Sequence, residues 1–131
     1  MKILNWEEFN SCVIKITTAC KGKKFTGVYG IPRGGLCLAV ALSHSMNIPL
    51  LSELRNGCLI VDDVYETGKT LNQVLKMHNA TTFVWVSKVT PTWWKAVEIA
   101  KPDEWLVFPW ENRALAEADM RSYQLSRSST T

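Results

Sequence analysis

The first part of the chain places apolar residues at the spacing of one helical face, at Trp6, Phe9, Val13 and Ile16. Asn5 precedes this pattern and Glu8 stands three residues later, as in a capping box at a helix N-terminus. Together these positions predict an amphipathic helix over residues 5–20.

Farther along the chain, short apolar runs alternate with helical patterns. The runs predict strands at residues 25–31, 50–54, 58–62, 81–88, 97–99 and 105–107. Helical patterns fall at 34–46 and 67–78. This alternation predicts an α/β fold with a parallel sheet covered by helices on both faces. The length suits one domain, which we place at residues 1–124, and the small polar tail 125–131 is expected to fray.

The segment 58–71 carries the most specific chemical pattern in the sequence. An apolar run typical of a strand buried on both faces leads into the paired carboxylates of Asp62 and Asp63. Open α/β sheets bind ligands at the C-terminal ends of such strands. The turn 67–70 then opens a helix. Its backbone N–H groups, two hydroxyls and the positive end of the helix dipole suit a phosphate dianion.

Two other interpretations apply to this segment. Gly68-Lys69-Thr70 ends like a P-loop, but a P-loop requires a glycine where Asp63 stands. A carboxylate inside a phosphate-wrapping loop would repel the ligand, which excludes a P-loop triphosphatase. An ordinary strand, acidic turn and capped helix without a ligand stays open, because acids also stabilise helix N-termini.

The run from Asp62 to Thr70 resembles the phosphoribosyl pyrophosphate (PRPP) signature of the type I phosphoribosyltransferases. The resemblance implies that Asp62 and Asp63 hold the ribose hydroxyls and the shell of a Mg²⁺ ion, with Asp63 as the metal residue. It implies that the 5′-phosphate is bound by Glu66, Thr67, Gly68, Lys69 and Thr70. The implied fold is the family's parallel α/β sheet with a small C-terminal segment that binds the base.

A second loop, between the first predicted strand and its helix, carries the same resemblance. Arg33 supplies a fixed positive charge, while Gly34 and Gly35 allow backbone N–H groups to approach an anion closely. Alone, the loop would fit a plain glycine turn. It closely resembles the family's pyrophosphate loop, which implies that Pro32, Arg33, Gly34 and Gly35 bind pyrophosphate. Family members hold the peptide before the arginine in the cis form, and here that bond joins Pro32 to Arg33.

The later part of the sequence resembles the base site of the xanthine, guanine and hypoxanthine (6-oxopurine) branch of this family. Lys88 ends a predicted strand, where it is either a donor to a base carbonyl or an ordinary surface lysine. The resemblance implies that Lys88 reaches the 6-oxo group, Trp105 stacks on the purine and Leu106 contacts the ring edge. Stacking on an aromatic ring is worth about 1–3 kcal/mol, which gives affinity without selecting a base.

Glu66 has two open interpretations. It falls where many purine enzymes of the family carry an Asp near N7 of the base, a position suited to taking a proton as the glycosidic bond forms, although Glu is one methylene longer. Alternatively, its charge only favours the start of the following helix. Under the first interpretation, Glu66 completes a predicted catalytic set with Asp62, Asp63 and Arg33.

The sequence departs from the family between the two loops. Residues 36–61 are filled by a predicted helix, strand and turn, so no room is left for the long mobile lid that family members insert here. A lid keeps water away from the activated sugar. The first hypothesis is therefore a phosphoribosyltransferase that uses PRPP, Mg²⁺ and hypoxanthine, guanine or xanthine. The second is a non-catalytic regulatory protein that binds PRPP or a nucleotide.

Composition and charge narrow the expected partners. The formal net charge of +3 suits an anionic small molecule as well as nucleic acid, so a nucleic-acid-binding module is the weakest hypothesis. No apolar run is long enough to span a bilayer, and residues 1–8 lack the apolar stretch of a signal peptide. We therefore expect a soluble, cytoplasmic protein. The resemblance adds an expected homodimer or higher homo-oligomer. The four cysteines are widely spaced and expected to be free thiols.

Overall fold

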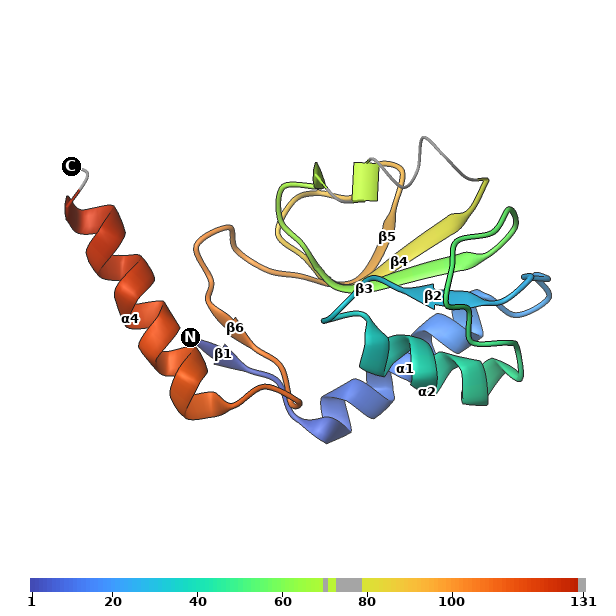
Figure 1. Cartoon of the computed structure of the whole chain (residues 1–131), viewed down its shortest axis with the longest axis horizontal. Helices are drawn as coiled ribbons and strands as arrows, with labels where there is room; N and C mark the ends of the chain where they lie inside the picture. The colour runs from blue at the N-terminus through green and yellow to red at the C-terminus, as the bar shows by residue number, and fades with distance from the viewer. Residues whose placement is uncertain (70, 73–78, 130–131) are drawn as a thin grey trace. The chain divides into compact units, whose positions relative to one another are not determined.

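The computed structural model describes residues 1–69, 71–72 and 79–129, with side chains up to residue 126. The elements in chain order are β1 (Lys2–Ile3), α1 (Trp6–Ala19), β2 (Val28–Gly30), α2 (Leu36–Met46), β3 (Leu59–Tyr65), β4 (Thr81–Ser87), β5 (Lys95–Ile99), β6 (Leu106–Val107) and α4 (Arg113–Ser129) (Figure 1). Two compact units divide the chain, Asn10–Pro102 and a smaller unit of Met1–Phe9 with Asp103–Thr131. In the described part of the chain, no helix is long and apolar enough to cross a membrane.

The larger unit contains a four-stranded parallel sheet in the order β2-β3-β4-β5. In the middle of β3, Val61 pairs with Gly30 of β2 and with Phe83 of β4. The pairing with β2 ends there, whereas β4 continues beside β3 until Tyr65 pairs with Ser87. The C-terminal half of β3 therefore extends beyond the end of β2.

Helices α1 and α2 lie on one face of this sheet (Figure 1). The hydroxyl groups of Thr17 in α1 and Ser45 in α2 are hydrogen-bonded at 2.9 Å. The predicted capping box is present, since the Glu8 N–H donates to Asn5 Oδ1 at 2.8 Å and the Asn5 N–H donates to Glu8 Oε1 at 3.3 Å. The helices predicted at 5–20 and 34–46 are thus confirmed within two residues at their ends.

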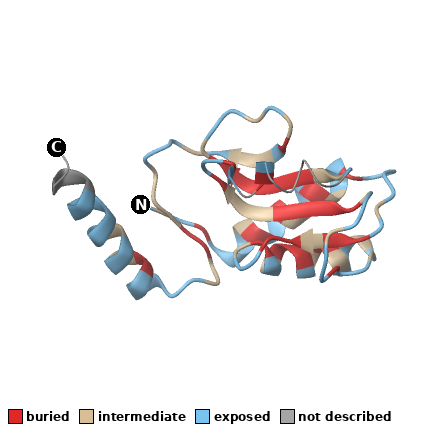
Figure 2. Cartoon of the chain, turned by 45° about the horizontal axis from the view of Figure 1, so that its top comes forward, coloured by how far each residue is buried: buried red, intermediate tan, exposed pale blue. Residues whose placement is uncertain are grey.

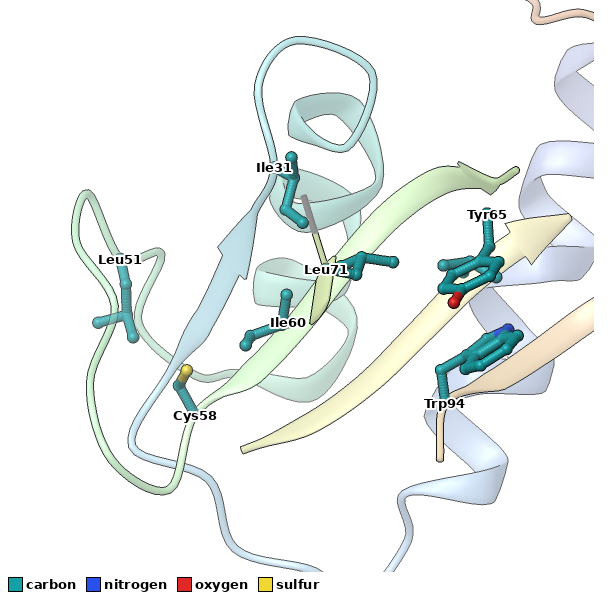
Figure 3. Packing of buried hydrophobic residues seen from close by; sticks show 8 residues of the cluster. Ile31, Leu51, Cys58, Ile60, Tyr65, Leu71 and Trp94 are labelled. Carbon is teal, nitrogen blue, oxygen red and sulfur yellow. The ribbon is translucent and has the colours of Figure 1, made fainter. Parts of the chain in front are cut away.

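A buried cluster packs on the sheet face away from α1 and α2 (Figure 3). Its members are Ile31, Leu51, Cys58, Ile60, Tyr65, Leu71, Val84 and Trp94. Figure 2 shows that buried residues concentrate on the strands of this unit. Most of the helix predicted at 67–78 lies outside the described residues, but Lys69, Leu71 and Asn72 are helical. Leu71, only 3% exposed, brings this segment onto the second face.

Three strand predictions need correction. The strand expected at 50–54 is wrong, because Leu50 forms only an isolated bridge to Val28 and the chain then bends at exposed Ser52 and Glu53. The strand expected at 25–31 is limited to β2. The strand expected at 58–62 continues to Tyr65, because β4 keeps pairing with it. The acid pair therefore lies within β3 and not after its end.

The smaller unit pairs β1 with β6 in a two-stranded parallel sheet, with Lys2 opposite Leu106. Neither β1 nor α4 was predicted. The start of α4 is capped by Asn112, whose Oδ1 accepts the Leu115 N–H at 3.1 Å. Residues 125–129, predicted as part of a frayed tail, are the last residues of α4. Their fraying and the single domain over 1–124 stay predictions.

Candidate active site

The acid pair is held on the part of β3 that extends beyond β2. The Asp63 N–H donates to Asp62 Oδ1 at 2.8 Å, and the Val64 N–H donates to Asp63 Oδ1 at 2.8 Å. Each carboxylate is therefore tied to the backbone of its own strand, and both side chains are half-buried. The strand fixes where the two negative charges lie.

Burial raises the pKa of both carboxyl groups. For Asp62, lost hydration is the largest cause, and the charge of Asp63 and a hydrogen bond to that side chain bring the pKa to about 8. Burial is also the largest cause for Asp63, where hydrogen bonds to Asp62 and to the Val64 N–H oppose the rise in pKa. Two neighbouring acids with raised pKa values favour a shared proton or a bound cation.

A pocket of about 280 Å³ opens beside the acid pair. Its wall includes Asp62, Asp63 and residues 66–69, together with Pro32 from the second loop. The structure thus brings four of the five predicted phosphate residues to this pocket, but only Pro32 of the four predicted pyrophosphate residues. The volume lies near the lower end of the range for small-molecule sites.

The predicted phosphate loop, described here over residues 66–69 and called the phosphate loop below, has a backbone that only glycine fits at Gly68. Gly68 has a φ of +73°, and a Cβ there would collide with the hydroxyl of Tyr65. The Lys69 N–H donates to Thr67 Oγ1 at 3.4 Å, which helps to shape the turn. Thr70, the remaining predicted phosphate residue, lies outside the described residues.

The predicted pyrophosphate loop packs directly on the acid pair. The Pro32–Arg33 peptide is cis, as the resemblance implied. A Cβ on Gly34 would collide with the carboxylate of Asp63, and one on Gly35 would lie 2.5 Å from the carbonyl oxygen of Val61. Both glycines are therefore required by close approach to β3. The Arg33 side chain is exposed, and Arg33 is not on the wall of the pocket beside the acids.

Lys88 and Glu66 are brought together by the register of the sheet. Because Tyr65 pairs with Ser87, the next residue of each strand leaves the sheet on the same edge. Lys88 Nζ lies 2.6 Å from Glu66 Oε1, and the Lys88 side chain is only 12% exposed. Its N–H also donates to the Tyr65 carbonyl at 2.9 Å. The Lys88 stem is thus buried, while its ammonium reaches the exposed carboxylate of Glu66.

Trp105 and Leu106 belong to the smaller unit, so their predicted contact with the base stays a prediction. The Trp105 ring lies beside Tyr123 of α4, with centroids 5.5 Å apart and planes inclined by 40°. Trp105 Nε1 is buried, and no hydrogen-bond partner for it exists among the described residues. Leu106 pairs with Lys2 in the two-stranded sheet.

The residues around the pocket suit a cation that is shared with a substrate. In the described part of the chain, no three His, Cys, Asp or Glu residues gather as a metal site. The half-buried Asp62 and Asp63 are hard oxygen donors, and Mg²⁺ is typically held by one or two carboxylates, with waters and substrate phosphates completing its shell. The cysteines are free thiols, as predicted, with Cys12, Cys20 and Cys58 buried and Cys37 half-buried.

Sequence reasoning missed the apolar part of this site. Tyr65 and Leu71 line the pocket, and Trp94 stacks on Tyr65. The signal for Tyr65 was its position within the acidic motif, between two residues that the motif singles out. Trp94 had no signal in the sequence, because its contact with Tyr65 depends on the fold.

No protein-family model matches the chain. Among solved structures, the purine phosphoribosyltransferase of Pyrococcus horikoshii matches with a TM-score of 0.71 and 25% identity, over 84% of this chain and 93% of that one. The xanthine-guanine-hypoxanthine phosphoribosyltransferase of Helicobacter pylori matches with a TM-score of 0.62 and 19% identity, over 90% and 97%. A hypothetical protein from Neisseria gonorrhoeae with bound ppGpp matches with a TM-score of 0.61 and 16% identity, over 92% and 97%. The chain therefore has the fold of the type I phosphoribosyltransferases.

Proposed function

We propose that this protein is a phosphoribosyltransferase that transfers the phosphoribosyl group of PRPP to a 6-oxopurine base with the help of Mg²⁺. The observation that carries the proposal is the ion pair of Lys88 and Glu66, which stands next to the pocket of Asp62 and Asp63. The groups that we propose for the sugar phosphate and for the base thus lie at one edge of the sheet. The similar fold of two purine phosphoribosyltransferases supports the same proposal.

The chemistry of the pair favours an oxo group over an amino group on the base. The ammonium of Lys88 has only donors, so it suits a carbonyl oxygen and not an amino group at C6. The carboxylate of Glu66 has only acceptors, so it suits a ring N–H such as that at N7. O6 and N7 are neighbours on one edge of a purine. Lys88 Nζ and Glu66 Oε1, which lie 2.6 Å apart, suit that edge as a neighbouring donor and acceptor.

The reaction needs one bond to form and one to break at C1′ of the ribose. A ring nitrogen of the purine attacks C1′, and the bond from C1′ to the pyrophosphate oxygen breaks with its electrons leaving on pyrophosphate. The base loses a proton, which the carboxylate of Glu66 would accept. Asp62 and Asp63 would hold Mg²⁺, which when bound supplies positive charge for the leaving group. Arg33 and the glycines beside it would bind the pyrophosphate, and residues 66–70 the 5′-phosphate.

The direct test is incubation of the protein with PRPP, Mg²⁺ and one base at a time, followed by chromatography of the nucleotides formed. Hypoxanthine, guanine or xanthine should give a nucleoside 5′-monophosphate, and adenine and orotate should give little. Calorimetry should show that PRPP binds. Binding of PRPP without product from any base would instead favour the regulatory protein.

Lys88→Ala tests the base assignment. The variant loses a charged hydrogen bond worth about 1.5–3 kcal/mol, so kcat/KM for the accepted oxopurine should fall by about tenfold to a hundredfold. Lys101→Ala, at an exposed lysine, is the matched control and should leave kcat/KM unchanged. An unchanged constant in Lys88→Ala for every oxopurine would remove Lys88 from the site.

A further inference from the structure

Two stacked aromatic rings lie beneath the predicted phosphate site. The rings of Tyr65 and Trp94 have centroids 3.7 Å apart and planes inclined by 11°, and Figure 3 shows them face to face. Trp94 is 4% exposed and Tyr65 is 7% exposed. Trp93 meets the Tyr65 ring edge-on at 6.3 Å. Tyr65 ends β3, whereas Trp94 belongs to the link between β4 and β5, so the stack joins two segments.

Tyr65 supports the phosphate loop from below. Its hydroxyl occupies the space that a side chain at position 68 would need, so the backbone of Gly68 rests directly on the phenol ring. Tyr65 also lines the pocket together with residues 66–69. A shift of this ring would therefore move the loop that is proposed to hold the 5′-phosphate.

Trp94 supports the segment that carries Lys88. Its Nε1 donates to Ser87 Oγ at 3.1 Å, and the Ser87 hydroxyl donates in turn to the Val89 carbonyl. These bonds fix the backbone on both sides of Lys88. The backbone N–H of Lys88 itself donates to the Tyr65 carbonyl at 2.9 Å. The same ring pair thus reaches both the phosphate loop and the lysine proposed to select the base.

We propose that Tyr65 and Trp94 are positioning residues that hold the phosphate loop and Lys88 in a fixed relation and so couple the sugar-phosphate and base subsites. Each aromatic ring turns about only two side-chain bonds, and stacked pairs prefer a defined geometry, so the pair resists relative displacement. The inference rests on the proposed function for its two subsites. The contact of the ring pair with the phosphate loop is measurable by binding alone, and the effect on Lys88 is measured through KM for the base.

Substitutions at Trp94 separate its hydrogen bond to Ser87 from its stacking on Tyr65. Trp94→Phe keeps a ring on Tyr65 but removes the indole N–H, so KM for the base should rise by about threefold to tenfold while KM for PRPP changes less than about twofold. Trp94→Leu removes the ring as well, so both KM values should rise. Trp6→Phe, at an exposed tryptophan outside the stack, is the matched control and should change neither. Unchanged KM values in Trp94→Leu would overturn the proposal.

A binding measurement keeps the test independent of turnover. Ribose 5-phosphate is titrated into the full chain while tryptophan emission is followed. Emission should change in the native protein and in the control Trp6→Phe, but not in Trp94→Phe, because Trp94 is the tryptophan stacked on Tyr65 under the loop. An equal change in Trp94→Phe would overturn the proposal. Ribose 5-phosphate binding with this pattern, but no product from any base, would support the contact of the ring pair with the loop and count against the transferase.

Thermal unfolding distinguishes positioning from general loss of structure. Trp94→Phe should unfold cooperatively, and its base KM should stay raised at temperatures well below its transition. If Trp94→Leu does not fold, Tyr65→Phe replaces it. That variant keeps the stack and removes only the hydroxyl against Gly68, so KM for PRPP should change more than KM for the base. The opposite order would contradict the role of Tyr65.

Discussion

Asp62 and Asp63 are half-buried neighbours on one strand, and we expect their charge to make the site sensitive to pH and to cations. Each carboxylate is held by a backbone N–H, so neither can turn away from the other without losing a hydrogen bond. The resulting repulsion is a cost to the fold that a proton or a metal ion relieves.

Asp62 should make the stability of the folded protein depend on pH. The folded pKa of Asp62 is about 8, above the ordinary value for aspartate of about 4. Between these values the folded protein binds more protons here than the unfolded chain does, so stability should fall as pH rises. The unfolding midpoint without Mg²⁺ should drop between about pH 5 and about pH 8. Asp62→Asn should reduce that drop, and an identical drop in the variant would contradict the assignment.

Asp63, the predicted Mg²⁺ ligand, should be needed for turnover. Asp63→Asn keeps the shape of the side chain and removes its charge, so kcat should fall by about a hundredfold or more at saturating Mg²⁺, as for loss of one preorganised electrostatic group. Asp103→Asn makes the same change at an exposed aspartate in the smaller unit and should retain full activity. Full turnover in Asp63→Asn would show that the acid pair has another role.

Single elements decide which groups can meet. Strand β3 continues past β2 because β4 pairs with it as far as Tyr65 and Ser87, and this extension carries the acids and then Glu66. In the smaller unit, α4 places Tyr123 beside Trp105. The predicted stacking residue is thus itself packed against a helix that the sequence analysis did not find.

Helix α4 should affect binding of the base through its contact with Trp105. If Trp105 stacks on the base, Tyr123→Ala should raise KM for the base by about threefold to tenfold, because one aromatic contact that orients Trp105 is lost. KM for PRPP should not change. Leu115→Ala truncates an exposed residue of the same helix and is the control. Equal KM values for the base in native protein and Tyr123→Ala would exclude α4 from the base site.

The whole protein should be stabilised when the site is filled. A ligand that binds only the folded state at about 100 times its dissociation constant adds about 2.7 kcal/mol to the free energy of unfolding. PRPP with Mg²⁺ should therefore raise the unfolding midpoint by several degrees. The same PRPP without Mg²⁺ should raise it less, and Asp63→Asn should abolish the difference. A shift that is independent of Mg²⁺ would mean that PRPP binds without the metal.

Much of the fold followed from local patterns. The capping box at Asn5 and Glu8 and the apolar run before Asp62 are signals within a few residues, and the structure contains the corresponding helix and strand. The strand expected at 50–54 failed because an apolar composition does not supply a pairing partner. Helix α4 was missed because its sequence is mostly polar, so apolar periodicity gave little sign of it.

The sequence by itself determined the α/β class and the location of the two loops. An apolar run followed by paired acids, or by a glycine turn, can be recognised in consecutive residues. Only the tertiary structure decided which residues from distant parts of the chain meet beside these loops. The register of β3 against β4 sets Glu66 beside Lys88, and the stack of Trp94 on Tyr65 joins segments far apart in the chain. The physical reason is that such distances depend on strand pairing and packing across the whole sheet, which no short stretch of sequence encodes.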